Sequence, residues 1–176
     1  MPQTISPFVP ALWTNQTITL FHGTIEASVN SILNHIDVAK GKANRDFGRG
    51  FYTTTVLRQG QSWAWQQAQR QTGSFPKPLP AIVAFDVERS ALAQLDLLWF
   101  VRGSYEASDF WSFVFHCRQG TSDHCRNDNQ EWYDVVVGPV SASWKQRLAI
   151  YDADQISFHT QRAAALLDAS NARRVL

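Results

Sequence analysis

The sequence predicts a single domain of the α+β class. Short strand-like runs alternate with short helix-like runs, but without the regular β-α-β spacing of a doubly wound parallel sheet. A length of 176 residues suits one domain, and such a chain can bury about 70% of the surface that its unfolded form exposes. We therefore expect an extended lead-in at residues 1–16, the domain at residues 17–170 and a C-terminal tail at residues 171–176.

Five runs predict strands from alternating, β-branched or continuously apolar residues. They are residues 17–22, 50–55, 81–87, 133–137 and 155–160. The first runs into a turn at Gly23, and Gly138 and Pro139 should end the fourth. Residues 90–100 are ambiguous and fit a helical turn followed by a strand.

Four runs predict helices: residues 25–36, 60–72, 109–117 and 161–169. In the first, apolar residues recur at helical spacing from Ile25 to Ile36. Gly73 and Pro76 should end the second, and Ser108 is an expected N-cap for the third. Residues 40–49 and 119–130 are polar and predict loops.

Composition and charge exclude several classes of protein. The net charge is +1 and no long run of like charges occurs, which argues against affinity driven mainly by phosphate contacts. Two cysteines make no disulfide framework and indicate a reducing, cytoplasmic setting. The N-terminus lacks the basic and apolar regions of a Sec signal, and no run approaches the roughly 18 apolar residues of a membrane span. We expect a cytoplasmic protein with no membrane partner, with signal-independent export as the alternative.

Aromatic residues are abundant, with seven tryptophans and eleven phenylalanines. They can pack a core or line a pocket for a planar ring.

The segment DFGRGFYTTT, residues 46–55, is the richest in chemistry. Two glycines bracket Arg49, so the backbone there can approach a ligand closely. If a strand begins at Gly50, Phe51 and Tyr52 point to opposite faces, and one ring can reach a cleft. The alternative is an ordinary glycine-rich turn. The segment matches neither a P-loop nor a GxGxxG motif.

A second segment, FHGT at residues 21–24, places a histidine at a strand end before a glycine. The glycine backbone can hold a carboxamide and the imidazole a ribose hydroxyl. The alternative is a simple turn that ends the strand.

Taken together, the two segments resemble the ADP-ribosyltransferase superfamily, in the His-Tyr branch shared by diphtheria toxin and the poly-ADP-ribose polymerases. More closely, the chain resembles a bacterial family of uncharacterised proteins with five motifs in the same order. Here these motifs are residues 21–24, 46–54, 63–64, 133–138 and 155–160. The resemblance implies a split antiparallel sheet flanked by short helices, NAD as co-substrate and no metal.

The resemblance also assigns roles to individual residues. His22 would bind a ribose hydroxyl, Gly23 would hold the carboxamide through its backbone, and Tyr52 would stack on the nicotinamide ring. Trp63, eleven residues after Tyr52, would cover the other side of that ring. Arg49, or alternatively Arg45, would meet the pyrophosphate; solvent exposure is the alternative for each.

Thr24 and Gly50 complete the NAD-binding set that the resemblance implies. Gln155 is a departure from the polymerases and many toxins, which place a glutamate on this late strand. An amide can orient the ribose but adds no negative charge and cannot act as a general base. The neighbouring Asp154 should face the opposite way. We therefore expect Gln155, with His22 and Tyr52, to support transfer of a single ADP-ribose or hydrolysis, and not chain elongation.

Two weaker signals concern other chemistry. The pairs His116-Cys117 and His124-Cys125 have the composition of a zinc site, but their spacing is wrong for one. A Cys-His nucleophile pair is disfavoured in the same way. A late carboxylate from Glu131, Asp134 or Asp152 is conceivable, but caps and turns are the expected roles of these residues.

The sequence thus predicts an NAD-dependent mono-ADP-ribosyltransferase that acts on a protein or nucleic acid, as a bacterial toxin or defence effector. A cognate antitoxin or immunity protein would be its further partner. The alternatives are an NAD glycohydrolase, an RNA 2′-phosphotransferase, a non-catalytic NAD or ADP-ribose-binding module, and a structural protein. The phosphotransferase should carry a basic phosphate-binding set, which the sequence does not reveal.

Overall fold

The computed structural model describes residues 17–71, 73, 75–101, 108–120 and 132–175, so the expected lead-in at residues 1–16 lies outside it. The elements in chain order are β1 (Thr17–Ile25), α1 (Glu26–Asn34), a 3-10 helix η1 (Val38–Lys40), β2 (Phe51–Thr53), α2 (Leu57–Gln69), β3 (Pro80–Glu88), α3 (Arg89–Leu92), β4 (Leu97–Trp99), α4 (Ser108–Gln119), β5 (Val135–Ser143), β6 (Leu148–Phe158), α5 (Gln161–Asp168) and β7 (Asn171–Arg174). Every expected strand and helix has a counterpart, and the α+β class is confirmed.

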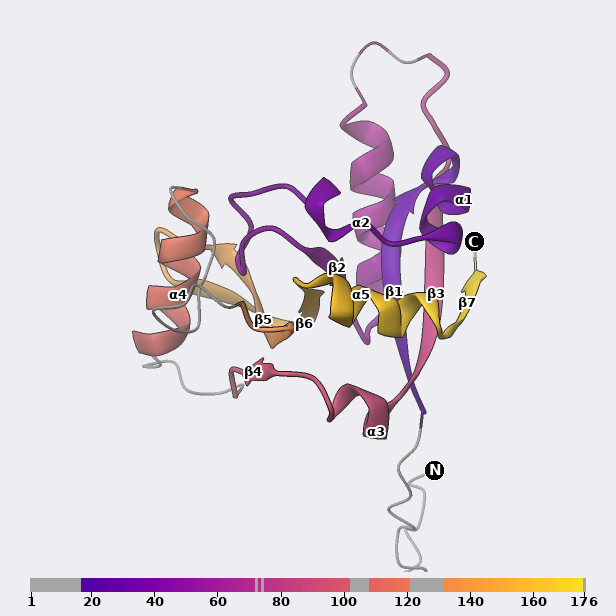
Figure 1. The fold of residues 1–176 in the computed structure, drawn as a ribbon. Coiled ribbons are helices and arrows are strands. Elements are labelled where there is room, and N and C mark those ends of the chain that lie inside the picture. Colours follow the sequence, from indigo (N-terminus) through magenta and orange to yellow (C-terminus); the bar gives the residue numbers. More distant parts are fainter. Residues whose placement is uncertain (1–16, 72, 74, 102–107, 121–131, 176) are drawn as a thin grey trace, which may run out of the picture.

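The strands form two sheets that lie side by side (Figure 1). One has the order β1-β3-β7 and the other the order β2-β6-β5-β4. α5 crosses in front of them as it carries the chain from β6 to β7, and α4 lies on the outer side of the second sheet. All pairs are antiparallel except β4 with β5, which run parallel. The antiparallel arrangement that the resemblance implies therefore does not hold for the β4–β5 pair.

Among the described residues, one isolated β-bridge joins the two sheets. The backbone N–H of Phe21 on β1 donates to the Thr54 carbonyl over 2.8 Å, and the Thr54 N–H donates to the Phe21 carbonyl over 3.0 Å. No longer ladder between β1 and β2 forms among the described residues. The two strands separate on either side of the bridge, and space opens between the sheets.

The main core lies beneath β1, β3 and β6. Leu20, Val83, Phe85 and Phe158 are fully buried there. α5 covers this core with Ala163, Ala164 and Leu167, which are also fully buried. A second cluster forms around Phe47, Phe110 and Val114, where α4 packs on the other sheet.

β5 does not end at Gly138 and Pro139, contrary to expectation, but runs on to Ser143. The ladder from β4 stops at Val137, so Pro139 removes no hydrogen bond on that side. On the other side, the register with β6 shifts directly after Pro139, as expected of a bulge.

The expected C-terminal tail is also partly wrong, because residues 171–174 form β7 against β3. Arg173 pairs with Asp86 of β3, and Arg174 pairs with Glu26 over 2.7 Å. None of the described helices is long and apolar enough to cross a membrane.

Gly23 lets α2 pack directly on β1. A Cβ at this position would lie 2.2 Å from the Gly60 carbonyl oxygen and 2.7 Å from the Ala64 backbone nitrogen. Both of these atoms belong to the backbone of α2, which cannot yield as a flexible side chain would. The glycine is therefore required by packing, whatever else its backbone binds.

We expect Gly23→Ala to destabilise the protein by at least about 1–3 kcal/mol, because the methyl group overpacks a backbone contact. In a thermal unfolding experiment, the melting temperature should fall by roughly 2–4 °C for each kcal/mol of lost stability. Thr17→Ala, at the exposed start of β1, is the control and should stay within about 0.5 kcal/mol of wild type. A Gly23→Ala protein as stable as wild type would mean that α2 can move away at no cost.

Candidate functional site

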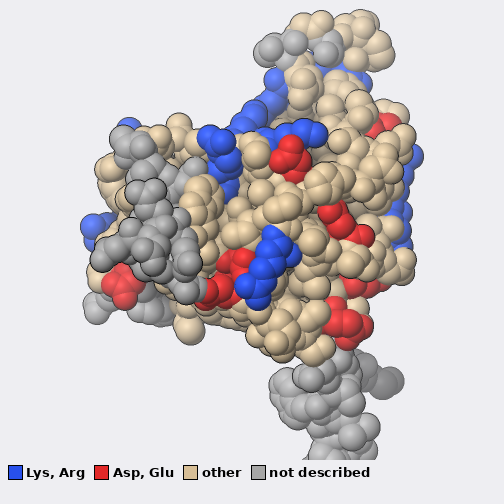
Figure 2. All heavy atoms as spheres, in the orientation of Figure 1, with Lys and Arg blue, Asp and Glu red and all other residues tan. Residues whose placement is uncertain are grey.

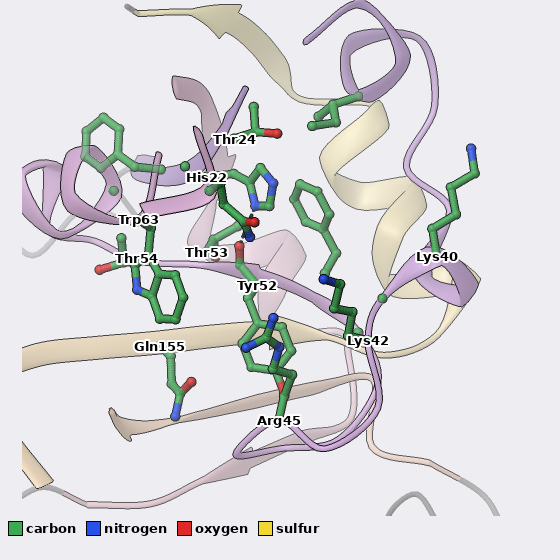
Figure 3. A pocket seen from close by; sticks show the side chains of 18 of the residues that line it. His22, Thr24, Lys40, Lys42, Arg45, Tyr52, Thr53, Thr54, Trp63 and Gln155 are labelled. Atoms are coloured by element: carbon green, nitrogen blue, oxygen red, sulfur yellow. Dashed lines mark hydrogen bonds between the residues drawn. The ribbon is translucent and has the colours of Figure 1, made fainter. Parts of the chain in front are cut away.

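A cavity of about 500 Å³ lies beside the bridge between the sheets, within the usual size range of small-molecule sites. Its walls come from β1, α1, the loop before β2, β2, α2, β5 and β6. The side chains of His22, Tyr52, Trp63 and Gln155 are arranged around it (Figure 3). Segments more than 100 residues apart in the sequence therefore meet in one space.

His22 is held by its neighbours on β2. Its Nδ1 lies 2.7 Å from the Tyr52 carbonyl oxygen, and its ring stacks on Phe51 with 4.2 Å between centroids. A carbonyl can only accept, so Nδ1 carries a proton and Nε2 of the neutral ring is an acceptor. Burial lowers the pKa of His22 below its ordinary value, and the bond to Tyr52 opposes this in part. The ring is therefore neutral near pH 7.

Tyr52 has its hydroxyl group occupied. The hydroxyl accepts from the Phe47 backbone N–H over 3.0 Å and donates to the Gly48 carbonyl over 2.7 Å. Burial raises the pKa of this phenol well above its ordinary value. The group cannot act as an acid or base near neutral pH, and Tyr52 offers a ligand the surface of its ring.

Gly23 presents its backbone toward the cavity side of β1. Phe21 uses its N–H and carbonyl to bond Thr54, and alternate residues of a strand direct these groups to the same edge. The carbonyl of Ile82, which lies opposite Gly23 on β3, bonds Val175 and so points away from β1. Gly23 therefore keeps its N–H and carbonyl on the free edge, where Thr24 also lines the cavity.

Gly50 lines the cavity, and a Cβ there would lie 2.7 Å from both the Phe158 carbonyl oxygen and His159 Nδ1. Arg49 does not line the cavity; its side chain is exposed and its carbonyl lies 2.7 Å from His159 Nδ1. His159, which sequence reasoning did not single out, thus contacts the backbone of the loop at Arg49 and Gly50 and supports it.

Arg45 lines the cavity and is half-buried, so the structure favours it over Arg49 as the basic residue of the site. No described residue forms a hydrogen bond or ion pair with its guanidinium. Burial lowers the pKa of Arg45, and the nearby Arg118 charge lowers it further. Lys40 and Lys42 line the same wall. Three basic side chains from the end of η1 and the loop that follows it therefore line one wall of the cavity.

Trp63 reaches the cavity from α2, as expected. The Arg70 guanidinium lies 5.8 Å from the centre of its ring, at cation–π distance. Trp63 and Tyr52 therefore supply two aromatic side chains from different elements.

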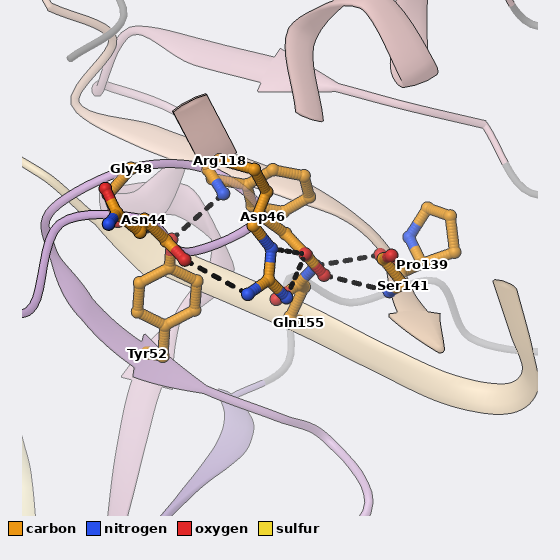
Figure 4. A network of polar contacts seen from close by, with 9 residues as sticks. Asn44, Asp46, Gly48, Tyr52, Arg118, Pro139, Ser141 and Gln155 are labelled. Carbon is orange, nitrogen blue, oxygen red and sulfur yellow. Dashed lines mark hydrogen bonds and ion pairs between the residues drawn. The ribbon is translucent and has the colours of Figure 1, made fainter. Parts of the chain in front are cut away.

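Gln155 lines the cavity from β6 and is almost fully buried. Its amide nitrogen donates to Asp46 Oδ2 and to the Pro139 carbonyl, each over 2.9 Å (Figure 4). Asp154 faces the other way, as expected, and bonds Thr54 and Thr55. Asp46, Arg118 and Ser141 are site residues that sequence reasoning missed. Asp46 could have been identified, because it is the first residue of the DFGRGFYTTT segment. No sequence pattern marks Arg118 or Ser141 as site residues.

No group of three or more histidine, cysteine, aspartate or glutamate side chains suited to a metal occurs in the described segments. His116 and Cys117 lie on α4, with Cys117 buried, while His124 and Cys125 lie outside the described residues. Glu131 lies outside them too. Asp134 has the expected structural role, since it accepts from the Asp96 N–H over 3.0 Å and bonds the Thr160 hydroxyl.

Comparison with known protein families gives one match, which covers residues 18–151 and is described as a protein of unknown function, DUF3990. The chain belongs to this family. The matched range of this DUF3990 protein contains both the HGT and the DFGRGFYTT segments and ends before Gln155. No curated protein and no solved structure matches the chain.

Charges on the face of this DUF3990 protein shown in Figure 2 are mixed, with basic and acidic side chains interspersed among uncharged ones. The described residues on that face form no broad surface of one sign.

We expect the His22 imidazole to titrate below pH 6.5 by NMR. Its pKa is lower in the folded than in the unfolded chain, so its contribution to stability is complete above about pH 6.5 and is lost as pH falls through the folded-state pKa. As pH falls below 6.5, the melting temperature of wild type should decrease more steeply than the melting temperature of His22→Gln. A titration midpoint above 6.5 would contradict the buried, neutral ring.

Proposed function

We propose that this DUF3990 protein is an NAD-dependent mono-ADP-ribosyltransferase with an ADP-ribosyltransferase-like fold. The observation that supports this most is convergence on one cavity of His22 Nε2, the free backbone edge at Gly23, the Tyr52 and Trp63 rings and the Gln155 amide. These groups match the chemistry of a nicotinamide riboside: a carboxamide, a planar ring and ribose hydroxyls.

Each group has a proposed part in binding. The Gly23 N–H and carbonyl hold the carboxamide, while Tyr52 and Trp63 pack on the nicotinamide ring. His22 Nε2 accepts a hydrogen bond from a ribose hydroxyl, because Nδ1 already donates to the Tyr52 carbonyl. Arg45, with Lys40 and Lys42 on the same wall, meets the pyrophosphate through charge-assisted hydrogen bonds.

In the proposed reaction, the bond between the ribose anomeric carbon and the nicotinamide nitrogen breaks, and nicotinamide leaves with the electron pair. The acceptor's nucleophilic atom then bonds that carbon and releases one proton. The acids that line the cavity are Asp37 and Asp46, and Asp46 is paired with Arg118 over 2.6 Å. Asp37 accepts from the Ala39 N–H over 2.9 Å at the start of η1. In this proposal no carboxylate acts as base, and catalysis rests on orientation and fixed dipoles.

With water as acceptor, the same site is an NAD glycohydrolase. The three cations on the loop wall also favour a second candidate, an RNA 2′-phosphotransferase, which must hold an additional phosphate. A toxin or defence role is part of the first proposal only.

One experiment separates these outcomes. The protein is incubated with adenine-labelled NAD and a cell lysate, and in parallel with 2′-phosphorylated RNA. Label in protein or nucleic acid supports transfer, free ADP-ribose supports hydrolysis, and loss of the RNA 2′-phosphate supports the phosphotransferase. If NAD protects the protein against thermal unfolding but no nicotinamide is released, the protein is a binding module. If NAD gives no protection, an NAD site is contradicted, because a ligand at 100 times its Kd should stabilise the folded protein by about 2.7 kcal/mol.

We expect Tyr52→Ala to lower kcat/KM for nicotinamide release by roughly 10-fold or more, because ring stacking contributes about 1–3 kcal/mol. Tyr52→Phe keeps the ring but removes the hydroxyl to which the Phe47 N–H donates. It should lower the melting temperature and keep turnover within a few-fold of wild type. Tyr151→Ala, on an exposed tyrosine of β6 outside the cavity, is the control. Equal loss in Tyr52→Phe and Tyr52→Ala would point to the hydroxyl and against stacking.

We expect Arg45→Gln to raise KM for NAD by about 10-fold, the effect of losing roughly 1.4 kcal/mol from a charge-assisted bond. Arg49→Gln should leave KM within about twofold, because Arg49 does not line the cavity. Steady-state kinetics at two salt concentrations measures both, and the salt dependence of KM should weaken in Arg45→Gln alone. If Arg49→Gln raised KM more than Arg45→Gln, Arg49 and not Arg45 would be the residue that binds the pyrophosphate.

A further inference from the structure

The Asp46 carboxylate connects four parts of the fold beside the cavity (Figure 4). Asp46 is only 3% exposed. Its Oδ1 accepts from Arg118 of α4, with Nε at 2.8 Å, while its Oδ2 accepts from the Ser141 N–H of β5 at 2.8 Å and from the Gln155 amide of β6 at 2.9 Å. Arg118 also donates to the Asn44 carbonyl over 3.0 Å and so ties α4 to the loop that carries Asp46.

This arrangement determines which way the Gln155 amide points. Both groups near one end of the amide, the Asp46 carboxylate and the Pro139 carbonyl, can only accept hydrogen bonds. The nitrogen must therefore face them and use both of its hydrogens there. The carbonyl oxygen Oε1 is left as an acceptor, and no described residue donates to it.

Ser141 supplies a second polar group at the same place. It lines the cavity and is 9% exposed, and its hydroxyl has no hydrogen-bond partner among the described residues. Its backbone N–H and the Gln155 amide share one oxygen of Asp46, so Ser141 and Gln155 lie next to each other. A buried hydroxyl without a partner costs free energy that a ligand can recover.

We propose that Asp46 is a positioning residue that locks the Gln155 amide with its oxygen toward the cavity, so that Gln155 Oε1 and the Ser141 hydroxyl together bind adjacent hydroxyl groups of a ligand, as in a ribose cis-diol. This inference rests on the proposed function and assigns its ribose subsite. Gln155 and Ser141 touch the ligand, whereas Asp46 acts only through these two residues.

The lock explains why an amide and not a carboxylate occupies this position. A glutamate at 155 would place its carboxylate against the Asp46 carboxylate and the Pro139 carbonyl, three acceptors with no donor between them. Gln155→Glu should therefore lose activity and stability at neutral pH. It should regain stability as pH falls, because a protonated carboxyl can donate to Asp46.

The lock itself is tested in the free protein by NMR, without any ligand. The side-chain NH2 protons of Gln155 should exchange slowly with solvent in wild type and rapidly in Asp46→Asn. Asp86→Asn, the same change at a carboxylate outside the cavity that pairs with Arg173, is the control and should leave Gln155 unaffected. Rapid exchange of these protons in wild type would overturn the lock. This measurement uses only the wild-type protein, so it does not depend on the folding of a variant.

The functional part is tested by nicotinamide release. Asp46→Asn should lower kcat by about 10–100-fold, as misplacement of a site group does, with a smaller change in KM. In a background that carries both Gln155→Met and Ser141→Ala, the same substitution should add less than about twofold, because both side chains that it positions are gone. Multiplying effects would assign Asp46 a general structural role and overturn the inference.

Ser141→Ala tests the diol site separately. It should leave the melting temperature of the free protein equal or higher, because an unsatisfied hydroxyl is removed, and should reduce the stabilisation by ADP-ribose. An unchanged ADP-ribose shift would overturn the role of Ser141. If wild type neither binds ADP-ribose nor releases nicotinamide, the proposed function fails too; if it does both while the lock tests fail, only this inference falls.

Discussion

Two backbone hydrogen bonds between Phe21 and Thr54 connect the two sheets, and the candidate site depends on this one bridge. In an antiparallel pair, the residues that follow Phe21 lie opposite those that precede Thr54. His22 and Gly23 are thus brought against Tyr52, and the bond from His22 Nδ1 to the Tyr52 carbonyl follows from this register. Because the strands then separate, the edge of β1 at Gly23 remains free. A continuous ladder would have used that edge and closed the cavity.

The Asp46 carboxylate performs a similar task on the other wall. It is buried, and Arg118 compensates its charge, as a buried carboxylate requires. Through Ser141 and Gln155 it orients parts of β5 and β6 that the bridge does not reach. The phenol of Tyr52 anchors the same loop through Phe47 and Gly48. The loop between η1 and β2 is therefore held at several points, although its sequence is polar and glycine-punctuated.

Local sequence patterns predicted most elements, because those elements are stabilised by the pattern itself. The apolar run of β3 is buried along its length, and Thr160 caps α5 by accepting from the Ala163 N–H over 3.1 Å. The errors arose where a partner decides. Pro139 is tolerated within β5 because β4 has already ended beside it, and β7 forms because β3 offers it an open edge. Neither circumstance can be read from the residues concerned.

For the site, the sequence by itself determined the motif residues His22, Gly23, Tyr52 and Trp63, since local spacing and glycine placement carry that information, and all of them line one cavity. Only the tertiary structure decided between Arg45 and Arg49 and joined Asp46, Arg118 and Ser141 to Gln155. The physical reason is that hydrogen bonding between residues 72 to 109 positions apart depends on how sheets and helices pack, and not on any local pattern.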